Sequence, residues 1–253
     1  MTERSTYSPG FFRSIRDDSY RSAKVVVPAV LEYVRPNSVV DVGCGLGCWL
    51  RAFQEQGIED FLGMDSHDVP PELLEFDAER FCVCDLTQPF SVGRRFNLAV
   101  CLEVAEHLPA SSADGLVRSL TQLAPVVLFS AAIPWQGGTH HVNEQWPAYW
   151  VERFRSRGWS VADCIRRRIW SNPQVGWWYA QNMLIYASAE ALEENPLLRE
   201  EVERTNVAQL AVVHPTHYLA VADPNRVSLK QTLAKLPGAA WRAVKRRVKH
   251  AAA

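Results

Sequence analysis

The chain has 253 residues, of which 47% are hydrophobic and 22% are charged, and its formal net charge is −1. This length and composition suffice for one sizeable hydrophobic core with an appendage. The nearly balanced charge argues against a protein that attracts nucleic acid through its overall field. Because no apolar run reaches 18 residues and the first residues lack a signal-like apolar stretch, we expect a cytoplasmic protein.

The first predicted element is a helix over residues 18–34, followed by an apolar strand over 38–42. Directly after this strand, glycines alternate with other residues at Gly43, Gly45 and Gly47. Glycine lacks Cβ, so the backbone can turn sharply and a ligand can approach closely. A strand, a glycine loop and then a helix, here predicted over 47–56, is the arrangement that nucleotide-type cofactors use at the carboxyl edge of a parallel sheet.

Three more short strands are predicted over 60–64, 80–84 and 96–102. All four strands end at or beside an acidic residue, and these residues are Asp41, Asp65, Asp85 and Glu103. Asp65 lies 22 residues after Gly43, where an acidic side chain can accept hydrogen bonds from a ribose diol. Four acids at one edge suit a cationic ligand better than the pyrophosphate of a dinucleotide.

A predicted helix over 111–123 and a strand over 126–130 continue the alternation, which indicates an α/β fold with a doubly wound, mostly parallel sheet and helices on both faces. After a helix over 148–157, the segments 159–170 and 178–188 can pair as antiparallel strands, which would complete a seven-stranded sheet. We place one domain at residues 1–188 and a helical C-terminal extension at 189–253.

The six cysteines raise the question of disulfides or a structural zinc site. Five lie in the glycine loop, its helix or apolar strands: Cys44, Cys48, Cys82, Cys84 and Cys101. Their spacing lacks the paired arrangement of a zinc site. We therefore expect reduced thiols that pack as small hydrophobic residues.

A basic tail covers residues 230–253, with seven Lys or Arg residues and no acid. On a helix, Trp241, Val244 and Val248 would share one face, with basic residues around them. This pattern is typical of a peripheral contact with a membrane or an acidic partner, and equally of a solvated tail.

The glycine loop, the strand before Asp65, and the segments 84–86 and 101–108 together resemble the class I S-adenosylmethionine-dependent methyltransferases, over about residues 20–135. The resemblance implies S-adenosyl-L-methionine as the cofactor. It places the glycines against the methionyl part, Asp65 on the ribose hydroxyls, and Asp85 with Leu86 at the adenine. The full set of cofactor-binding residues that we expect is Asp41, Gly43, Cys44, Gly45, Gly47, Asp65, Ser66, Asp85, Leu86 and Glu103.

Two segments offer groups that could activate a hydroxyl acceptor, whose proton must leave during methyl transfer. In the first, Glu106 and His107 follow Glu103 at positions that share one face of a helical turn. The second is the pair His140 and His141 in the loop after the strand over 126–130. The candidate catalytic residues are His107, His140 and His141.

These segments together resemble the small-RNA terminal 2′-O-methyltransferases, in which a Glu-x-x-Glu-His segment and a later histidine hold a divalent metal on the acceptor hydroxyls. The resemblance implies a divalent metal here, with Glu103, Glu106, His107 and His141 as ligands. Carboxylates and imidazoles together are a plausible ligand set for Mg²⁺, Mn²⁺ or Zn²⁺. Many class I methyltransferases carry a similar segment without metal. A metal site, a metal-free histidine base and purely structural roles all stay open.

The segments 140–147, 177–182 and 213–218 are similar to bacterial methyltransferases of polysaccharide assembly. The resemblance implies an O-methyltransferase that acts on a hydroxyl of a saccharide or oligosaccharide. Trp135 and Trp146 flank the histidines and are candidates to stack on a sugar, whereas we expect the core to contain Trp159, Trp170 and Trp178.

Two alternatives stay open. The Glu-x-x-Glu-His segment also resembles ubiquinone-pathway O-methyltransferases, which implies a small phenol or quinone precursor as the acceptor. A non-catalytic protein that binds S-adenosylmethionine in a glycan-assembly complex is the other. The near-neutral charge argues against RNA as the acceptor. The sequence does not indicate an oligomeric state.

Overall fold

The computed structural model describes residues 9–66 and 69–223, with side chains from residue 17 onward. The chain divides into two compact units, residues 1–212 and 213–253. The larger unit contains the sheet. The described part of the smaller unit contains one helix, α9 (Pro215–Ala222). The basic tail over 230–253, with its predicted membrane or partner contact, lies outside the described residues.

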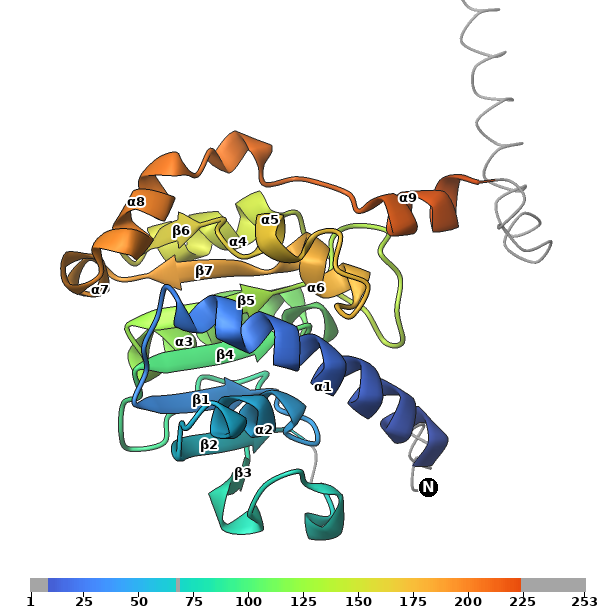
Figure 1. Ribbon diagram of the computed structural model, residues 1–253, viewed down its shortest axis with the longest axis vertical. Helices are drawn as coiled ribbons and strands as arrows, with labels where there is room; N and C mark the ends of the chain where they lie inside the picture. The colour runs from blue at the N-terminus through green and yellow to red at the C-terminus, as the bar shows by residue number, and fades with distance from the viewer. Residues whose placement is uncertain (1–8, 67–68, 224–253) are drawn as a thin grey trace, which may run out of the picture. The chain divides into compact units, whose positions relative to one another are not determined.

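The described part of the chain forms a seven-stranded sheet in the order β3-β2-β1-β4-β5-β7-β6 (Figure 1). The strands are β1 (Ser38–Val42), β2 (Asp60–Asp65), β3 (Phe81–Val83), β4 (Leu98–Leu102), β5 (Val126–Ser130), β6 (Ser160–Ala162) and β7 (Leu184–Ala187). The prediction of seven strands is confirmed, but the sheet is mixed rather than mostly parallel. The reason is β7, which runs antiparallel to both of its neighbours, β5 and β6.

The strand order reverses at β1, and this reversal positions the candidate site. β1 pairs in parallel with β2 on one side and with β4 on the other. Asp41 is in register with Gly63 of β2 and with Val100 of β4. The carboxyl ends of the three strands therefore lie side by side, and in open α/β sheets ligands bind outside such a reversal.

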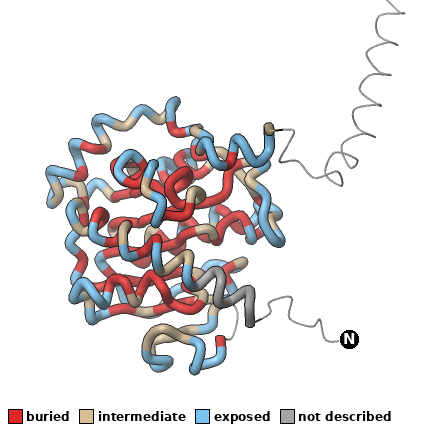
Figure 2. Tube along the Cα trace, turned by 45° about the vertical axis from the view of Figure 1, so that its right-hand side comes forward, coloured by how far each residue is buried: buried red, intermediate tan, exposed pale blue. Residues whose placement is uncertain are grey.

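Helices cover both faces of the sheet, as predicted. Alternate β1 residues point to opposite faces, so that Val39 joins one core cluster and Val40 the other. The first cluster includes residues of α1, α2 and α5–α8, and the second includes residues of α3 and α4. Figure 1 shows α1 and α2 crossing the near face of the sheet, and Figure 2 shows the buried segments inside a partly exposed outer layer. The strands β1, β4, β5 and β7 are buried along their whole length.

The helix bounds are as follows. The α-helices of the larger unit are α1 (Pro9–Leu31), α2 (Cys48–Glu55), α3 (Ala113–Leu123), α4 (Pro147–Arg155), α5 (Arg166–Ile169), α6 (Trp177–Asn182), α7 (Ala189–Glu194) and α8 (Pro196–Arg204). Short 3₁₀ helices are η1 (Pro71–Leu73), η2 (Ala78–Arg80), η3 (Ala105–His107), η4 (Ala110–Ser112) and η5 (Val207–Gln209).

The last two strands differ from the prediction. Both are shorter than the predicted segments 159–170 and 178–188, because α5 follows β6 and α6 precedes β7. The predicted antiparallel pairing of the two strands is correct. Some of the apolar residues in these segments lie on helices, where Ile169 of α5 and Tyr179 of α6 are buried in the first core cluster.

The helices after β7 also contribute to the core of the larger unit. Ala191 of α7 and Leu198 of α8 are buried in the first core cluster. The end of the catalytic domain at residue 188 stays a prediction. Among the described residues, every helix is too short or too polar to cross a lipid bilayer.

Candidate active site

The glycine loop after β1 is folded against the end of β2. The amides of Gly43 and Cys44 donate to the carbonyl oxygen of Met64, at 2.7 and 2.9 Å. The amide of Gly45 donates to the Oδ2 atom of Asp65 at 2.9 Å. Asp65 is thus held beside the loop, while Ser66, the next residue, is exposed.

The glycines of this loop meet different surroundings. Gly43, Gly45 and Gly47 have positive φ angles of 80°, 52° and 85°, which glycine adopts without strain. A Cβ atom on Gly43 would lie 2.3 Å from the Cγ2 atom of Val104. A Cβ atom on Gly45 would meet no described heavy atom within 4 Å. Gly43 therefore packs against the segment after β4, whereas Gly45 borders open space.

Asp41 is a buried carboxyl group next to this loop. It is 2% exposed, and its Oδ2 atom has no hydrogen-bond partner among the described residues. Burial, together with the negative charge of Asp65, raises the pKa of Asp41 to about 8. A buried acid of this kind is stabilised by a proton or by a nearby cation.

Asp85 and Leu86 follow β3 at the same edge of the sheet. Asp85 is exposed, and its Oδ1 atom accepts hydrogen bonds from the hydroxyl and the amide of Thr87 at 2.6 and 2.9 Å. These hydrogen bonds lower the pKa of Asp85, so the carboxylate is ionised at neutral pH. Leu86 is 2% exposed and forms part of the second core cluster.

Glu103 directly follows β4 and has a left-handed backbone conformation, with φ at 55°. Its carboxylate accepts hydrogen bonds from Asn182 Nδ2 at 3.1 and 3.3 Å and from Gln136 Nε2 at 3.0 Å. Burial raises the pKa of Glu103, and these amide donors act in the opposite direction. Glu103 is therefore held in place by side chains that follow β5 and precede β7.

Glu106 lies in η3 and is fully buried. Neither of its carboxylate oxygens has a hydrogen-bond partner among the described residues. Burial, with the negative charge of Glu103 as the next cause, raises the pKa of Glu106 well above its usual range. The carbonyl oxygen of Glu106 accepts the amides of Val142 and Asn143, at 2.8 and 3.0 Å, which attaches the loop after β5 to η3.

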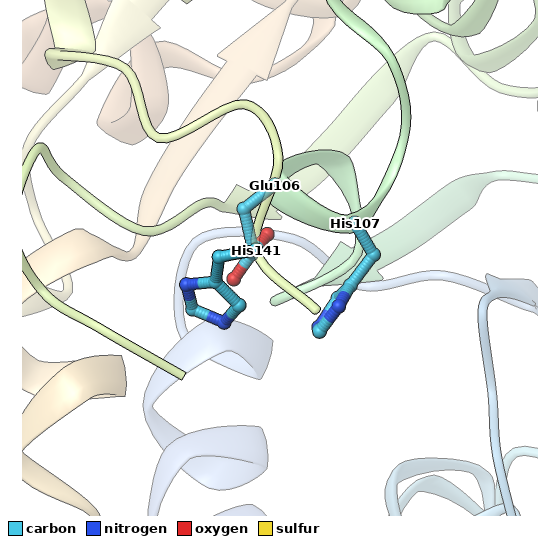
Figure 3. Close-up of side chains that lie close together, drawn as sticks. All are labelled: Glu106, His107 and His141. Carbon is cyan, nitrogen blue, oxygen red and sulfur yellow. The ribbon is translucent and has the colours of Figure 1, made fainter. Parts of the chain in front are cut away.

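This attachment brings His141 beside His107. The two rings meet edge to face with their centroids 4.9 Å apart. Glu106, His107 and His141 each offer a ligand atom, and these atoms lie within 4.8 Å of one another (Figure 3). A Cβ atom on Gly138 would lie 2.2 Å from His141 Nε2, so the ring packs directly on this glycine.

Two other sequence candidates lie outside this group of three. One is His140, which is exposed and has a φ angle of 60°. The other is Glu103, whose carboxylate binds the side-chain amides of Gln136 and Asn182. On the other side of His141, the Nδ1 atom lies 2.9 Å from the Oε1 atom of Glu144. Glu144 thus orients the His141 ring.

Sequence reasoning missed Gln136, Glu144, Gln181 and Asn182. The Oε1 atom of Gln136 accepts from Asn182 Nδ2 at 2.9 Å and from Gln181 Nε2 at 3.0 Å, so these amides and Glu103 form one network. Gln181 and Asn182 are buried. The available signal was the pair of adjacent amide residues, Gln181 and Asn182, the second of which lies two residues before the first residue of the last strand. Buried positions there would normally be apolar.

Residues 15–168, more than half of the chain, match the family model described as a methyltransferase domain. The chain belongs to this methyltransferase family. The prediction of an enzyme is thereby confirmed, and S-adenosylmethionine as its methyl donor is supported. No curated protein sequence matches the chain.

Solved methyltransferases share the fold. DesVI of Streptomyces venezuelae has a TM-score of 0.54 and 13% identity, over 75% of this chain and 100% of that one. The sugar N-methyltransferase KedS8 of Streptoalloteichus sp. ATCC 53650 has a TM-score of 0.52 and 16% identity, over 74% and 98%. Magnesium protoporphyrin IX methyltransferase of Synechocystis PCC 6803, solved with SAM bound, has a TM-score of 0.51 and 19% identity, over 73% and 87%.

Substitution of Gly43 and of Gly45 should lower the free energy of unfolding by different amounts. Gly45→Ala should lower the free energy of unfolding by about 1–2 kcal/mol, because alanine is strained at positive φ. Gly43→Ala should cost about 1–3 kcal/mol more, because its Cβ also overlaps Val104. Urea unfolding without cofactor measures both values. Equal losses in the two variants would contradict the packing of Gly43 on Val104.

Asp41 predicts a pH dependence of stability. Between its ordinary pKa of 3.8 and about 8, Asp41 is protonated in the folded protein and ionised in the unfolded chain. Because the folded state then binds more protons, the free energy of unfolding falls as pH rises through this range.

Asp41→Asn should flatten this slope and exceed the wild type in stability above pH 8, by up to several kcal/mol. Urea unfolding at a series of pH values, without cofactor, measures the effect. The exposed Asp85 gives the control, since Asp85→Asn should leave the slope between pH 4 and 8 unchanged. The same slope in Asp41→Asn and wild type would show that Asp41 is not the titrating group.

Proposed function

We propose that the enzyme transfers a methyl group from S-adenosylmethionine to a hydroxyl of a saccharide or oligosaccharide. The observation that carries the proposal is the contact between the glycine loop and the segment after β4. Gly43 packs on Val104, and Glu106 and His107 follow Val104 by two and three residues. The expected donor site and the acid–histidine group are therefore neighbours at one edge of the sheet.

The residues at the donor side fit a cationic cofactor. Gly45 borders open space and Asp65 is held at the loop. The Oδ2 atom of Asp41, which has no hydrogen-bond partner among the described residues, can be stabilised by positive charge. The sulfonium and amino groups of the cofactor supply such charge. The remaining proposed contacts follow the loop and the neighbouring strand ends: Gly43, Cys44, Gly47, Ser66, Asp85, Leu86 and Glu103.

His141 is the proposed acceptor of the hydroxyl proton. Its Nδ1 atom faces the carboxylate of Glu144, which favours the tautomer with the proton on Nδ1 and leaves the lone pair on Nε2. As the acceptor oxygen bonds to the methyl carbon, the carbon–sulfur bond breaks and its electron pair stays on sulfur. The proton of the hydroxyl passes to Nε2, and S-adenosylhomocysteine leaves.

In an alternative arrangement, Nε2 of His141 would bind a divalent cation together with Glu106 and His107, and His141 would then be a ligand rather than the base. Glu106 offers a buried carboxylate without a hydrogen-bond partner among the described residues, and His107 and His141 add two imidazoles. A carboxylate behind a histidine, as Glu144 lies behind His141, is the usual surrounding of a metal-binding imidazole. Mg²⁺ or Mn²⁺ bound there would lower the pKa of the acceptor hydroxyl.

The saccharide as acceptor rests on the loop after β5. Trp135 is 79% exposed in this loop, and Trp146, at its end, is partly exposed. Such aromatic faces can stack on the C–H surface of a sugar ring. KedS8, described as a sugar N-methyltransferase, has the same fold, which is compatible with a sugar acceptor. A phenol or quinone precursor is the alternative acceptor.

Labelled S-adenosylmethionine should transfer its methyl group to members of a saccharide panel and not to quinone precursors or short RNAs. His141→Ala should lower kcat by about 10²–10⁴-fold, the usual contribution of a general base. Its affinity for S-adenosylhomocysteine, measured by calorimetry, should stay close to that of the wild type.

His140→Ala is the matched control, because His140 is exposed and lies outside the group of three. It should retain nearly full turnover. Full turnover of His141→Ala, or an equal loss in both variants, would rule out His141 as the base. Transfer to quinone precursors alone would select the alternative acceptor.

The metal alternative predicts loss of turnover on treatment with EDTA and recovery on addition of Mg²⁺ or Mn²⁺. Glu106→Gln keeps the shape of the side chain but removes its charge, so it should raise the metal concentration needed for half-maximal recovery. Turnover of the wild type that is indifferent to chelation would leave His141 acting without metal.

A further inference from the structure

The side chain of Trp135 is exposed to solvent, although the backbone of this residue has a strained conformation. Its side chain is 79% exposed, and its φ of 66° lies in the left-handed region. A bulky residue in that region is a rare and strained exception, and such strain persists only where the surroundings impose it. Neither packing nor backbone preference therefore explains a tryptophan at this position.

Glu144 imposes the conformation. Its Oε2 atom accepts the amide of Trp135 at 2.7 Å, and its Oε1 atom accepts the amide of Gly137 at 2.7 Å. The same Oε1 atom lies 2.9 Å from Nδ1 of His141. One carboxylate thus holds both the backbone that carries the exposed indole and the ring of the proposed base.

The rest of the loop is also held in place. The amide of Gln145 donates to the carbonyl of Ala132 at 3.0 Å, which closes the base of the loop. Within it, the side chain of Gln136 binds Glu103 and Asn182. The loop is therefore ordered without an acceptor, and a preformed site loses less entropy on binding.

We propose that Glu144 clamps the loop over residues 134–145 as a preformed acceptor site, in which the Trp135 indole stacks on a sugar ring of the acceptor. This inference rests on the proposed function, since it assigns the acceptor contact of the same site. The flat indole offers a large contact area with few rotatable bonds, which suits the C–H face of a pyranose. Because the clamp also orients His141, acceptor position and base position are set together.

Kinetic measurements on variants separate the stacking role of Trp135 from the positioning role of Glu144. Trp135→Ala should raise KM for the saccharide about tenfold or more, the equivalent of losing one stacking contact. Its kcat and its affinity for S-adenosylhomocysteine should stay near those of the wild type. Trp135→Tyr should recover part of the loss. Leu197→Ala, which removes another exposed apolar side chain in α8, is the control and should leave KM unchanged.

Glu144→Gln tests the clamp. The amide group has one acceptor oxygen instead of two, so it cannot hold the amides and His141 as the carboxylate does. This variant should raise KM and also lower kcat, whereas Trp135→Ala should raise KM alone. This difference identifies Glu144 as a positioning residue. A general loss of stability would instead change KM and kcat in the same way in both variants.

A further comparison needs no acceptor. Trp135→Gly and Trp135→Ala both remove the indole, but only glycine relieves the left-handed strain. The glycine variant should therefore melt about 2–4 °C higher than the alanine variant. Equal melting temperatures would overturn the strained presentation of Trp135.

The outcomes distinguish this inference from the function on which it rests. If the wild type methylates a saccharide and Trp135→Ala keeps the same KM, the acceptor platform is refuted while the function stands. A Glu144→Gln variant with unchanged KM and kcat refutes the clamp. If saccharides are not methylated but another acceptor is, the proposed function fails, and the sugar-stacking role of Trp135 fails with it.

Discussion

The site depends on one backbone contact between distant parts of the chain. The carbonyl oxygen of Glu106 accepts the amides of Val142 and Asn143, and this contact joins the segment after β4 to the loop after β5. Without it, His141 would have no fixed place beside His107. The parallel pairing of β4 with β5 makes the contact possible, because it brings the ends of both strands to the same edge of the sheet.

The same edge of the sheet contains buried acids that lower the free energy of unfolding of the protein without a bound cofactor. Asp41 and Glu106 are buried with oxygen atoms that lack a hydrogen-bond partner among the described residues, and burial raises the pKa of each. Such groups destabilise a fold unless a proton or a cation compensates them. The proposed function would explain their presence beside a glycine loop, with a cationic donor bound on one side and proton or metal chemistry on the other. Functional sites commonly combine strain and perturbed acids in this way.

Most of the fold and the place of the candidate site in it could be predicted, because their signals are local. Apolar strands that end in acids, with glycines after the first strand, indicated the edge at which Asp41 and Asp65 lie. The contacts on the proposed acceptor side were predicted less completely. His107 and His141 were recognised, but Glu144, Gln136 and Asn182 were not, because their roles depend on hydrogen bonds between separate loops. The helices that shorten the last two strands were missed because a short apolar segment fits either periodicity.

The sequence by itself determined the α/β class, the seven strands and the methyltransferase family, since periodicity and the glycine loop are properties of neighbouring residues. Only the tertiary structure decided which candidates meet. It brought Glu106, His107 and His141 together and placed Glu103 among side-chain amides instead. It also showed that Glu144 joins Trp135 to His141. Such contacts follow from strand register and loop closure, which no local pattern specifies.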